Sequence, residues 1–202
     1  MKNKILILFA HPRFEMSKNN STLVKKVQRM PGITFHDLYE TYPDFNINIE
    51  YEKKLLIDHN IIIWQHPFYW YSAPPLLKQW IDLVLAFGWA YGPGGDALQD
   101  KIIFNSITSG GQRSAYSNDG HNRFTVNELL APFNQTATLC KMIYLPPFAV
   151  HGTHRISSEE LTRIAQWYWN ILDRLINAEF SIKEIQKYPY LNDWITSKTG
   201  KN

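Results

Sequence analysis

Cysteine is nearly absent from this chain of 202 residues, which contains only Cys140. A single cysteine excludes a disulfide within the chain and argues against a cysteine-rich metal site. Because Cys140 lies among apolar residues, we expect a buried and unreactive thiol. An unpaired cysteine is also compatible with a reducing compartment.

The sequence lacks a long hydrophobic run as well. The apolar stretch at residues 5–10 is too short for the core of a signal peptide. Nowhere does the chain approach the roughly 18–20 consecutive apolar residues that span a bilayer. We therefore expect a soluble, cytoplasmic protein.

A large excess of one charge is also missing. The chain has 21 Lys and Arg residues against 18 Asp and Glu residues, a net charge of +3, and its basic residues form no long run. This dispersed charge gives no indication of a nucleic-acid partner, so we expect none. A content of 45% hydrophobic and 19% charged residues is typical of one compact domain.

Several catalytic motifs are missing. The sequence contains neither the GxGxxG and GxxxxGK[ST] loops of common nucleotide-binding sites nor the GxSxG turn of serine hydrolases. His151 and His154 form an HxxH pair, but no cysteine or acidic residue is adjacent to it. We therefore predict no metal site.

What the chain does contain is an alternation of short apolar segments with helical patterns, which predicts an α/β fold with a parallel sheet. Residues 39–48 are expected to form a loop. We divide the chain into one domain, residues 1–178, and a C-terminal tail, residues 179–202. The predicted strands are residues 5–10, 33–38, 61–65, 101–107 and 142–150. The first predicted helix has its N-cap among residues 17–21 and ends at Pro31-Gly32, and the other predicted helices are residues 49–59, 76–85, 126–139 and 157–175.

Two predicted strand ends carry residues that suit a ligand, and ligands of open parallel sheets bind at such ends. Ser17, Asn19, Asn20 and Ser21 follow the first strand near a helix start, where they suit a phosphate, although ordinary N-capping needs only one of them. Thr108-Ser109-Gly110-Gly111 follows the fourth strand and lets backbone approach a ligand closely, although a plain turn is the alternative.

The third strand has the most unusual end. In IIIWQHPFYWY, residues 61–71, Phe68, Tyr69, Trp70 and Tyr71 follow an apolar run directly. Together with the other two strand ends, this aromatic platform predicts a site for a mononucleotide with a planar ring system, such as FMN. The alternative is a core or subunit contact, because Trp and Tyr are enriched at interfaces.

Six short motifs are spread along the chain, and two of them contain strand ends described above. They are AHP at residues 10–12, TYPDFNI at 41–47, WQHPFYWYSAPPLLKQWID at 64–82, GWAYGPGG at 88–95, TSGG at 108–111 and LPPF at 145–148. The set resembles the flavodoxin-like NAD(P)H:quinone oxidoreductases, and most closely the bacterial branch that includes the ancillary proteins of glutathione-gated potassium efflux systems. The resemblance covers about residues 5–175.

The resemblance implies a flavodoxin-like three-layer sandwich, with a five-stranded parallel sheet of order 2-1-3-4-5 and helices on both faces. It also implies a homodimer with a flavin at each subunit boundary, where Gly88, Trp89 and Ala90 contribute to the site and the subunit contact. The implied cofactor-binding residues are His11, Ser17, Lys18, Asn19 and Asn20 for the phosphate, Phe68, Tyr69, Trp70 and Tyr71 for the ring, and Thr108, Ser109, Gly110 and Gly111 for the other edge of the ring.

Two residues are implied to be catalytic. Quinone reductases of this superfamily have a Tyr and a His shortly after the Gly-Gly loop that assist hydride transfer. Tyr116 and His121 occupy similar places, with a spacing one residue shorter. Trp70 is the aromatic residue that we expect to face the ring, and we expect a structural role for His66.

The implied function is that of an NAD(P)H dehydrogenase (quinone)-type flavoprotein, which passes hydride from NAD(P)H through the flavin to quinones or similar electrophiles in a ping-pong sequence. The resemblance points to FMN, and no adenine site can be identified, but the sequence leaves FAD open as well; NADH and NADPH both remain open. The alternative is a regulatory ancillary subunit of a glutathione-gated potassium/proton antiporter, peripheral to the inner membrane through that partner. A one-electron flavodoxin fits less well, because such carriers are typically strongly acidic and this sequence has a pI of about 8.8.

Overall fold

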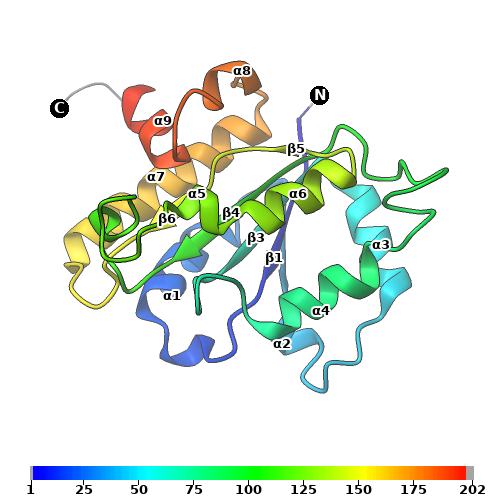
Figure 1. The fold of residues 1–202 in the computed structure, drawn as a ribbon, viewed down its shortest axis with the longest axis horizontal. Coiled ribbons are helices and arrows are strands. Elements are labelled where there is room, and N and C mark those ends of the chain that lie inside the picture. Colours follow the sequence, from blue (N-terminus) through cyan, green and yellow to red (C-terminus); the bar gives the residue numbers. More distant parts are fainter. Residues whose placement is uncertain (1, 199–202) are drawn as a thin grey trace.

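A parallel sheet of order β2-β1-β3-β4-β5 lies at the centre of the computed structural model, which describes residues 2–198 (Figure 1). The predicted strand order is therefore confirmed. The predicted fifth strand is divided in two, because Pro146-Pro147 cannot donate ladder hydrogen bonds, and both parts pair with β4. The strands are β1 (Ile5–Phe9), β2 (Ile33–Asp37), β3 (Ile61–Pro67), β4 (Ile102–Thr108), β5 (Ile143–Tyr144) and β6 (Phe148–Val150).

Helices cover both faces of the sheet (Figure 1). Among the described residues, no helix combines the length and the apolar character that a membrane span requires. The α-helices are α1 (Lys18–Val27), α2 (Leu38–Thr41), α3 (Ile49–Asp58), α4 (Pro75–Val84), α5 (Val126–Leu129), α6 (Ala131–Leu139), α7 (Ser158–Ile176), α8 (Ile182–Ile185) and α9 (Leu191–Lys198), and the 3-10 helices are η1 (Phe14–Met16) and η2 (Arg113–Ala115).

The apolar strands are buried on both faces, as their continuous hydrophobic sequences predict. In β1, Ile5, Ile7 and Phe9 belong to the core that contains α1, α7 and α9. Leu6 and Leu8 point the other way and belong to the core that contains α3, α4 and α6. This alternation follows from the two-residue period of a strand.

Three predicted boundaries were wrong for local reasons. The expected loop at residues 39–48 begins with α2, because the Asp37 side chain accepts hydrogen bonds from the backbone N–H groups of Tyr39 and Glu40. The expected helix at residues 126–139 is divided at Leu130, and Pro132 lies in the first turn of α6, where a missing N–H is tolerated. β3 continues beyond residue 65 because His66 and Pro67 still pair with β4.

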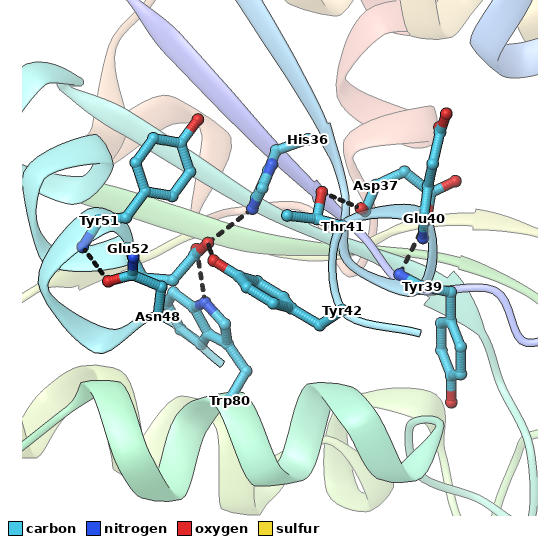
Figure 2. A network of polar contacts seen from close by, with 10 residues as sticks. All are labelled: His36, Asp37, Tyr39, Glu40, Thr41, Tyr42, Asn48, Tyr51, Glu52 and Trp80. Carbon is cyan, nitrogen blue, oxygen red and sulfur yellow. Dashed lines mark hydrogen bonds and ion pairs between the residues drawn. The ribbon is translucent and has the colours of Figure 1, made fainter. Parts of the chain in front are cut away.

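A buried carboxylate joins β2, α3 and α4. Glu52 of α3 is fully buried, and it accepts hydrogen bonds from Tyr42 Oη (2.6 Å), His36 Nε2 (2.7 Å) and Trp80 Nε1 (2.7 Å). Figure 2 shows these three side chains converging on the Glu52 carboxylate from separate elements. Because a buried carboxylate is costly unless its oxygens are satisfied, the three donors explain how it is accommodated.

Cys140 is the C-cap residue of α6, and its side chain is buried in the core. Its burial raises the pKa of the thiol to about 11. The expected burial of Cys140 is confirmed, and a raised thiol pKa disfavours the reactive thiolate, so low reactivity stays the prediction.

The segment after Ala178 packs onto the sheet through α9, which lies beside α7 (Figure 1). Leu191, Trp194 and Ile195 are buried in the same core as α1 and α7. Asn192 pairs with the outer strand β6: its Oδ1 accepts from the Ala149 N–H (2.9 Å) and its Nδ2 donates to the Ala149 carbonyl (3.0 Å). One side chain thus takes the place of a neighbouring strand at this edge. The division of the chain at residue 178 stays a prediction.

Candidate functional site

A cavity of about 570 Å³ opens at the carboxyl ends of β1, β3 and β4. It brings together all three strand ends that the sequence indicated. The predicted residues on its wall are His11, Ser17, Lys18, Asn19, Phe68, Tyr69, Thr108 and Gly110. The wall also contains residues that the sequence did not predict, namely Arg13, Met16, Pro67, Thr153 and His154.

One end of the cavity is built by the start of α1. Ser17 is the N-cap of this helix, and its side chain accepts a hydrogen bond from the Asn20 N–H. Lys18 and Asn19 lie in the first turn, and Arg13 adds a second cation to the wall. A helix start with free N–H groups, an amide and two cations suits an anionic group.

Asn20 supports this end of the cavity from behind. It is buried, and its Nδ2 donates to Ser17 Oγ (3.1 Å) and to Thr108 Oγ1 (3.2 Å), which joins the first loop to the end of β4. Its Oδ1 has no hydrogen-bond partner in the part of the chain that the structure describes. Asn20 therefore fixes the wall and does not itself line the cavity.

His11 stands between the two ends of the cavity. Its Nδ1 accepts a hydrogen bond from the Arg13 N–H (3.1 Å), so the ring proton of the neutral form is on Nε2. Burial lowers the pKa of His11, which favours that neutral form. The ring packs edge-on against Tyr69 at 6.2 Å. His11 can therefore donate one hydrogen bond to a ligand from Nε2.

The aromatic residues after β3 form a tight turn. The Ser72 N–H donates to the Tyr69 carbonyl (3.0 Å), and Trp70 and Tyr71 at the tip have φ angles of 49° and 62°. Left-handed φ values at both tip positions are characteristic of type I′ turns, which favour Asn-Gly. For other residues this conformation costs roughly 1–2 kcal/mol each. Strained backbone of this kind is concentrated at functional sites.

The members of the aromatic platform have different surroundings. Phe68 is buried, Tyr69 lies on the cavity wall, and Trp70 is 92% exposed. Trp70 does not line the cavity of the single chain, so its expected contact with a ring stays a prediction.

The two glycines after β4 are closely approached by side chains of other loops. A Cβ on Gly110 would lie 2.6 Å from His154 Nε2, and a Cβ on Gly111 would lie 3.1 Å from the Tyr116 ring. Small residues at these positions let the loop pack closely against the His154 and Tyr116 rings.

The two predicted catalytic residues differ in burial, and their catalytic roles stay predictions. Tyr116 is buried, with its ring 5.9 Å from Phe68 and 5.5 Å from His151. His121 is exposed, and no ring contact or hydrogen bond joins it to Tyr116 among residues 2–198. The histidine beside Tyr116 is therefore His151, which was considered in the sequence only as a metal ligand.

His66 has the structural role expected for it. Its Nδ1 donates to the Pro67 carbonyl (2.9 Å), and its Nε2 accepts from Asn105 Nδ2 (3.0 Å). Burial lowers the pKa of His66 to about 4, so the ring is neutral near pH 7.

Comparison with known proteins identifies the family. Residues 3–172 match a protein family whose members have a flavodoxin-like fold. The chain is 45% identical, over 82% of its length and 90% of the relative, to the glutathione-regulated potassium-efflux system ancillary protein KefG of Pectobacterium atrosepticum.

Two solved structures are also similar. General stress protein 14 of Treponema denticola, in complex with FMN, has 40% sequence identity and a TM-score of 0.81, covering 85% of this chain and 99% of that chain. An NADPH-quinone reductase from P. pentosaceus has 33% sequence identity and a TM-score of 0.76, and the match covers 82% of this chain and 95% of that chain. The chain therefore belongs to the flavodoxin-like family of NAD(P)H:quinone-type oxidoreductases, in the branch that includes the KefG proteins.

Proposed function

We propose that this protein binds FMN and transfers two electrons from NAD(P)H to a quinone or a similar electrophile. The observation that carries the proposal is the cavity. At one end it has the cationic start of α1, and at the other it has aromatic side chains and the backbone of the loop after β4. Its volume of about 570 Å³ lies within the range of small-molecule sites, about 300–1,000 Å³. A relative with 40% identity binds FMN.

The residues present fit a flavin mononucleotide. Ser17, Lys18 and Asn19 would hold the phosphate, with Arg13 adding charge. The ring would lie toward Phe68, Tyr69, Trp70 and Tyr71, with Thr108, Ser109, Gly110 and Gly111 along its other edge. When bound, FMN supplies the two-electron chemistry, while the protein supplies orientation and charge. FMN is preferred to FAD because the cavity has one cationic end that suits a single phosphate, and because a solved relative with 40% identity is in complex with FMN.

We propose that two side chains act on the bound ring. Tyr116 would donate a hydrogen bond from its hydroxyl, and His11 would donate from Nε2. Both groups stabilise negative charge on a bound ring without being ionised themselves. NAD(P)H and the acceptor would occupy the same open side of the cavity in turn, which gives a ping-pong sequence.

The proposal is tested by mixing the FMN-loaded protein with NADH or NADPH in the absence of oxygen. We expect at least one of them to abolish the flavin colour in a single turnover. If both nucleotides leave the colour of the bound flavin unchanged, the protein is not an NAD(P)H oxidoreductase.

The exposed aromatic tip supports a homodimer. Trp70 is almost fully exposed, and Tyr71 Oη reaches Asn122 Oδ1 at 3.4 Å, so the tip is continuous with the loop that follows Tyr116. Contiguous exposed apolar patches often mark interaction sites, and Tyr69, Trp70 and Tyr71 are three consecutive exposed aromatic residues. We therefore propose that a second copy of the chain closes the cavity from this side.

Replacement of Trp70 by alanine is expected to weaken FMN binding about tenfold to a hundredfold, because stacking of a flat ring on an aromatic side chain contributes roughly 1–3 kcal/mol. Titration of the flavin-free protein with FMN measures the effect. Leu139→Ala, which removes an exposed apolar side chain at the end of α6, is the control. Unchanged flavin affinity and reduction rate, together with a weakened dimer, would mean that the aromatic tip is only a subunit contact.

A second candidate function is that of an ancillary subunit of a potassium efflux antiporter, which would place the protein in the cytoplasm against the inner membrane. The 45% identity to KefG favours it. The two functions are compatible. A variant whose bound flavin NAD(P)H no longer reduces provides the test. If that variant still co-purifies with the antiporter, the regulatory role depends on binding and not on electron transfer.

A further inference from the structure

Three polar side chains form a chain of hydrogen bonds within the sheet, on the face that α6 covers. Tyr144 Oη of β5 donates to Asn105 Oδ1 of β4 (2.6 Å). Asn105 Nδ2 donates to His66 Nε2 of β3 (3.0 Å), and His66 Nδ1 donates to the Pro67 carbonyl (2.9 Å). Asn105 and His66 are fully buried. The chain thus crosses three neighbouring strands and ends at a residue of the cavity wall.

The direction of each hydrogen bond in this chain follows from its last acceptor. The Pro67 carbonyl can only accept, so His66 Nδ1 must carry a proton. Neutral His66 then has a lone pair on Nε2, which accepts from the Asn105 amide nitrogen. The reverse orientation of that amide would require a proton on both ring nitrogens. Such a charge is costly here, because His66 is fully buried and no carboxylate bonds to it within residues 2–198.

The peptide that joins Pro67 to Phe68 is held at both of its polar atoms. Its oxygen accepts from His66 Nδ1 and also from the Tyr69 N–H (3.0 Å). Its N–H donates to the Thr108 carbonyl at the end of β4 (2.8 Å). Phe68 and Tyr69 both line the cavity, so the orientation of this peptide determines where their side chains lie on the wall.

Neither packing nor strand register explains the polar residues at these positions. The neighbouring side chains on the same face are hydrophobic and buried, namely Trp64, Ile103 and Ile107. Seven residue pairs already fix the register of β3 against β4. Phe133 of α6 stacks on the His66 ring, with 5.7 Å between centroids, and an apolar side chain could make the same contact. An apolar residue at position 66 could not donate to the Pro67 carbonyl.

We propose that His66, oriented by Asn105 and Tyr144, is a positioning residue that holds the Pro67–Phe68 peptide and thereby the aromatic side chains of the cavity wall. The inference rests on the proposed function for the identity of the ligand, FMN. The hydrogen-bond chain itself is a property of the flavin-free protein.

Three replacements of His66 separate this role from packing. Asparagine places a side-chain N–H near the position of Nδ1, glutamine places one near Nε2, and leucine has none. In the flavin-free protein, we expect the Tyr69 N–H to exchange with solvent about tenfold faster in His66→Leu and His66→Gln, and at nearly the wild-type rate in His66→Asn. The same two variants should bind FMN fivefold to tenfold more weakly in a titration, the range that one hydrogen bond accounts for.

Two further measurements test the chain itself. Nitrogen-15 NMR of the flavin-free wild-type protein should show the His66 proton on Nδ1 and a lone pair on Nε2. Asn105→Leu, which frees the ring to carry its proton on Nε2, should weaken FMN binding as His66→Leu does.

Ile62→Ala is the matched control, because Ile62 is buried on the same strand and the same face, at the end away from the cavity. It should lower stability and leave FMN affinity unchanged. Unchanged FMN affinity in His66→Leu, equal losses in all three His66 variants, an equal loss in Ile62→Ala, or a wild-type proton on Nε2 would each overturn the proposal. If the wild-type protein does not bind FMN, the proposed function fails, and exchange of the Tyr69 N–H still decides whether His66 holds the peptide.

Discussion

Replacement of Asn19 by aspartate is expected to weaken FMN binding roughly a hundredfold. Asn19 lies in the first turn of α1 on the cavity wall, where we place the phosphate. The substitution keeps the shape of the side chain and adds one negative charge. Two like charges about 4 Å apart near a protein surface repel by about 4 kcal/mol before screening by salt, and each 1.4 kcal/mol corresponds to about a tenfold change in affinity.

Riboflavin, which has the ring and no phosphate, makes this experiment specific. Asn19→Asp should leave riboflavin affinity almost unchanged while FMN affinity falls. Asn134→Asp, an equal change of charge on the exposed surface of α6, should leave both affinities unchanged. Equal losses for riboflavin and FMN would mean that the phosphate does not lie at the start of α1.

Replacement of Trp194 by alanine is expected to lower the free energy of unfolding by about 3–5 kcal/mol, the usual cost of removing a buried Trp or Phe side chain. Trp194 is 0% exposed and lies in the core beneath α7, although it belongs to the segment that the sequence marked as a tail. Urea unfolding monitored by circular dichroism gives the midpoint and the free energy for each variant.

Trp70→Ala is the matched control, because it makes the same substitution at a side chain that is 92% exposed. It should change stability by less than about 1 kcal/mol. If Trp194→Ala is no more destabilising than Trp70→Ala, the folded domain ends near Ala178 and the segment after it is a separable tail.

The sheet could be predicted from the sequence because its physical signal is local. β1 and the first four residues of β3 are continuously apolar, a pattern that is typical of strands covered on both faces. The loops after β1, β3 and β4 could be expected to meet because the carboxyl ends of parallel strands share one edge. The motif resemblance added the strand order, which periodicity alone does not determine.

The remainder of the site depends on contacts between distant residues. Thr153 and His154 reach the cavity because the loop after β6 packs against Gly110, and no spacing in the sequence indicates that contact. His121 is close to Tyr116 along the chain, but His151 is close to it in space. The docking of α9 depends on Asn192, whose side chain pairs with a strand backbone in a way that no residue pattern predicts.

The central claim is that one cavity serves NAD(P)H and an electron acceptor in turn through bound FMN. Sequential anaerobic mixing tests it most directly: the FMN-loaded protein is first reduced with one equivalent of NAD(P)H and then mixed with a soluble quinone. We predict that the flavin colour is lost in the first mixing, that it returns in the second, and that excess NAD(P)H slows its return by competing for the same cavity. Bound FMN that neither nucleotide reduces, or reduced FMN whose reoxidation the quinone does not accelerate, would contradict the claim.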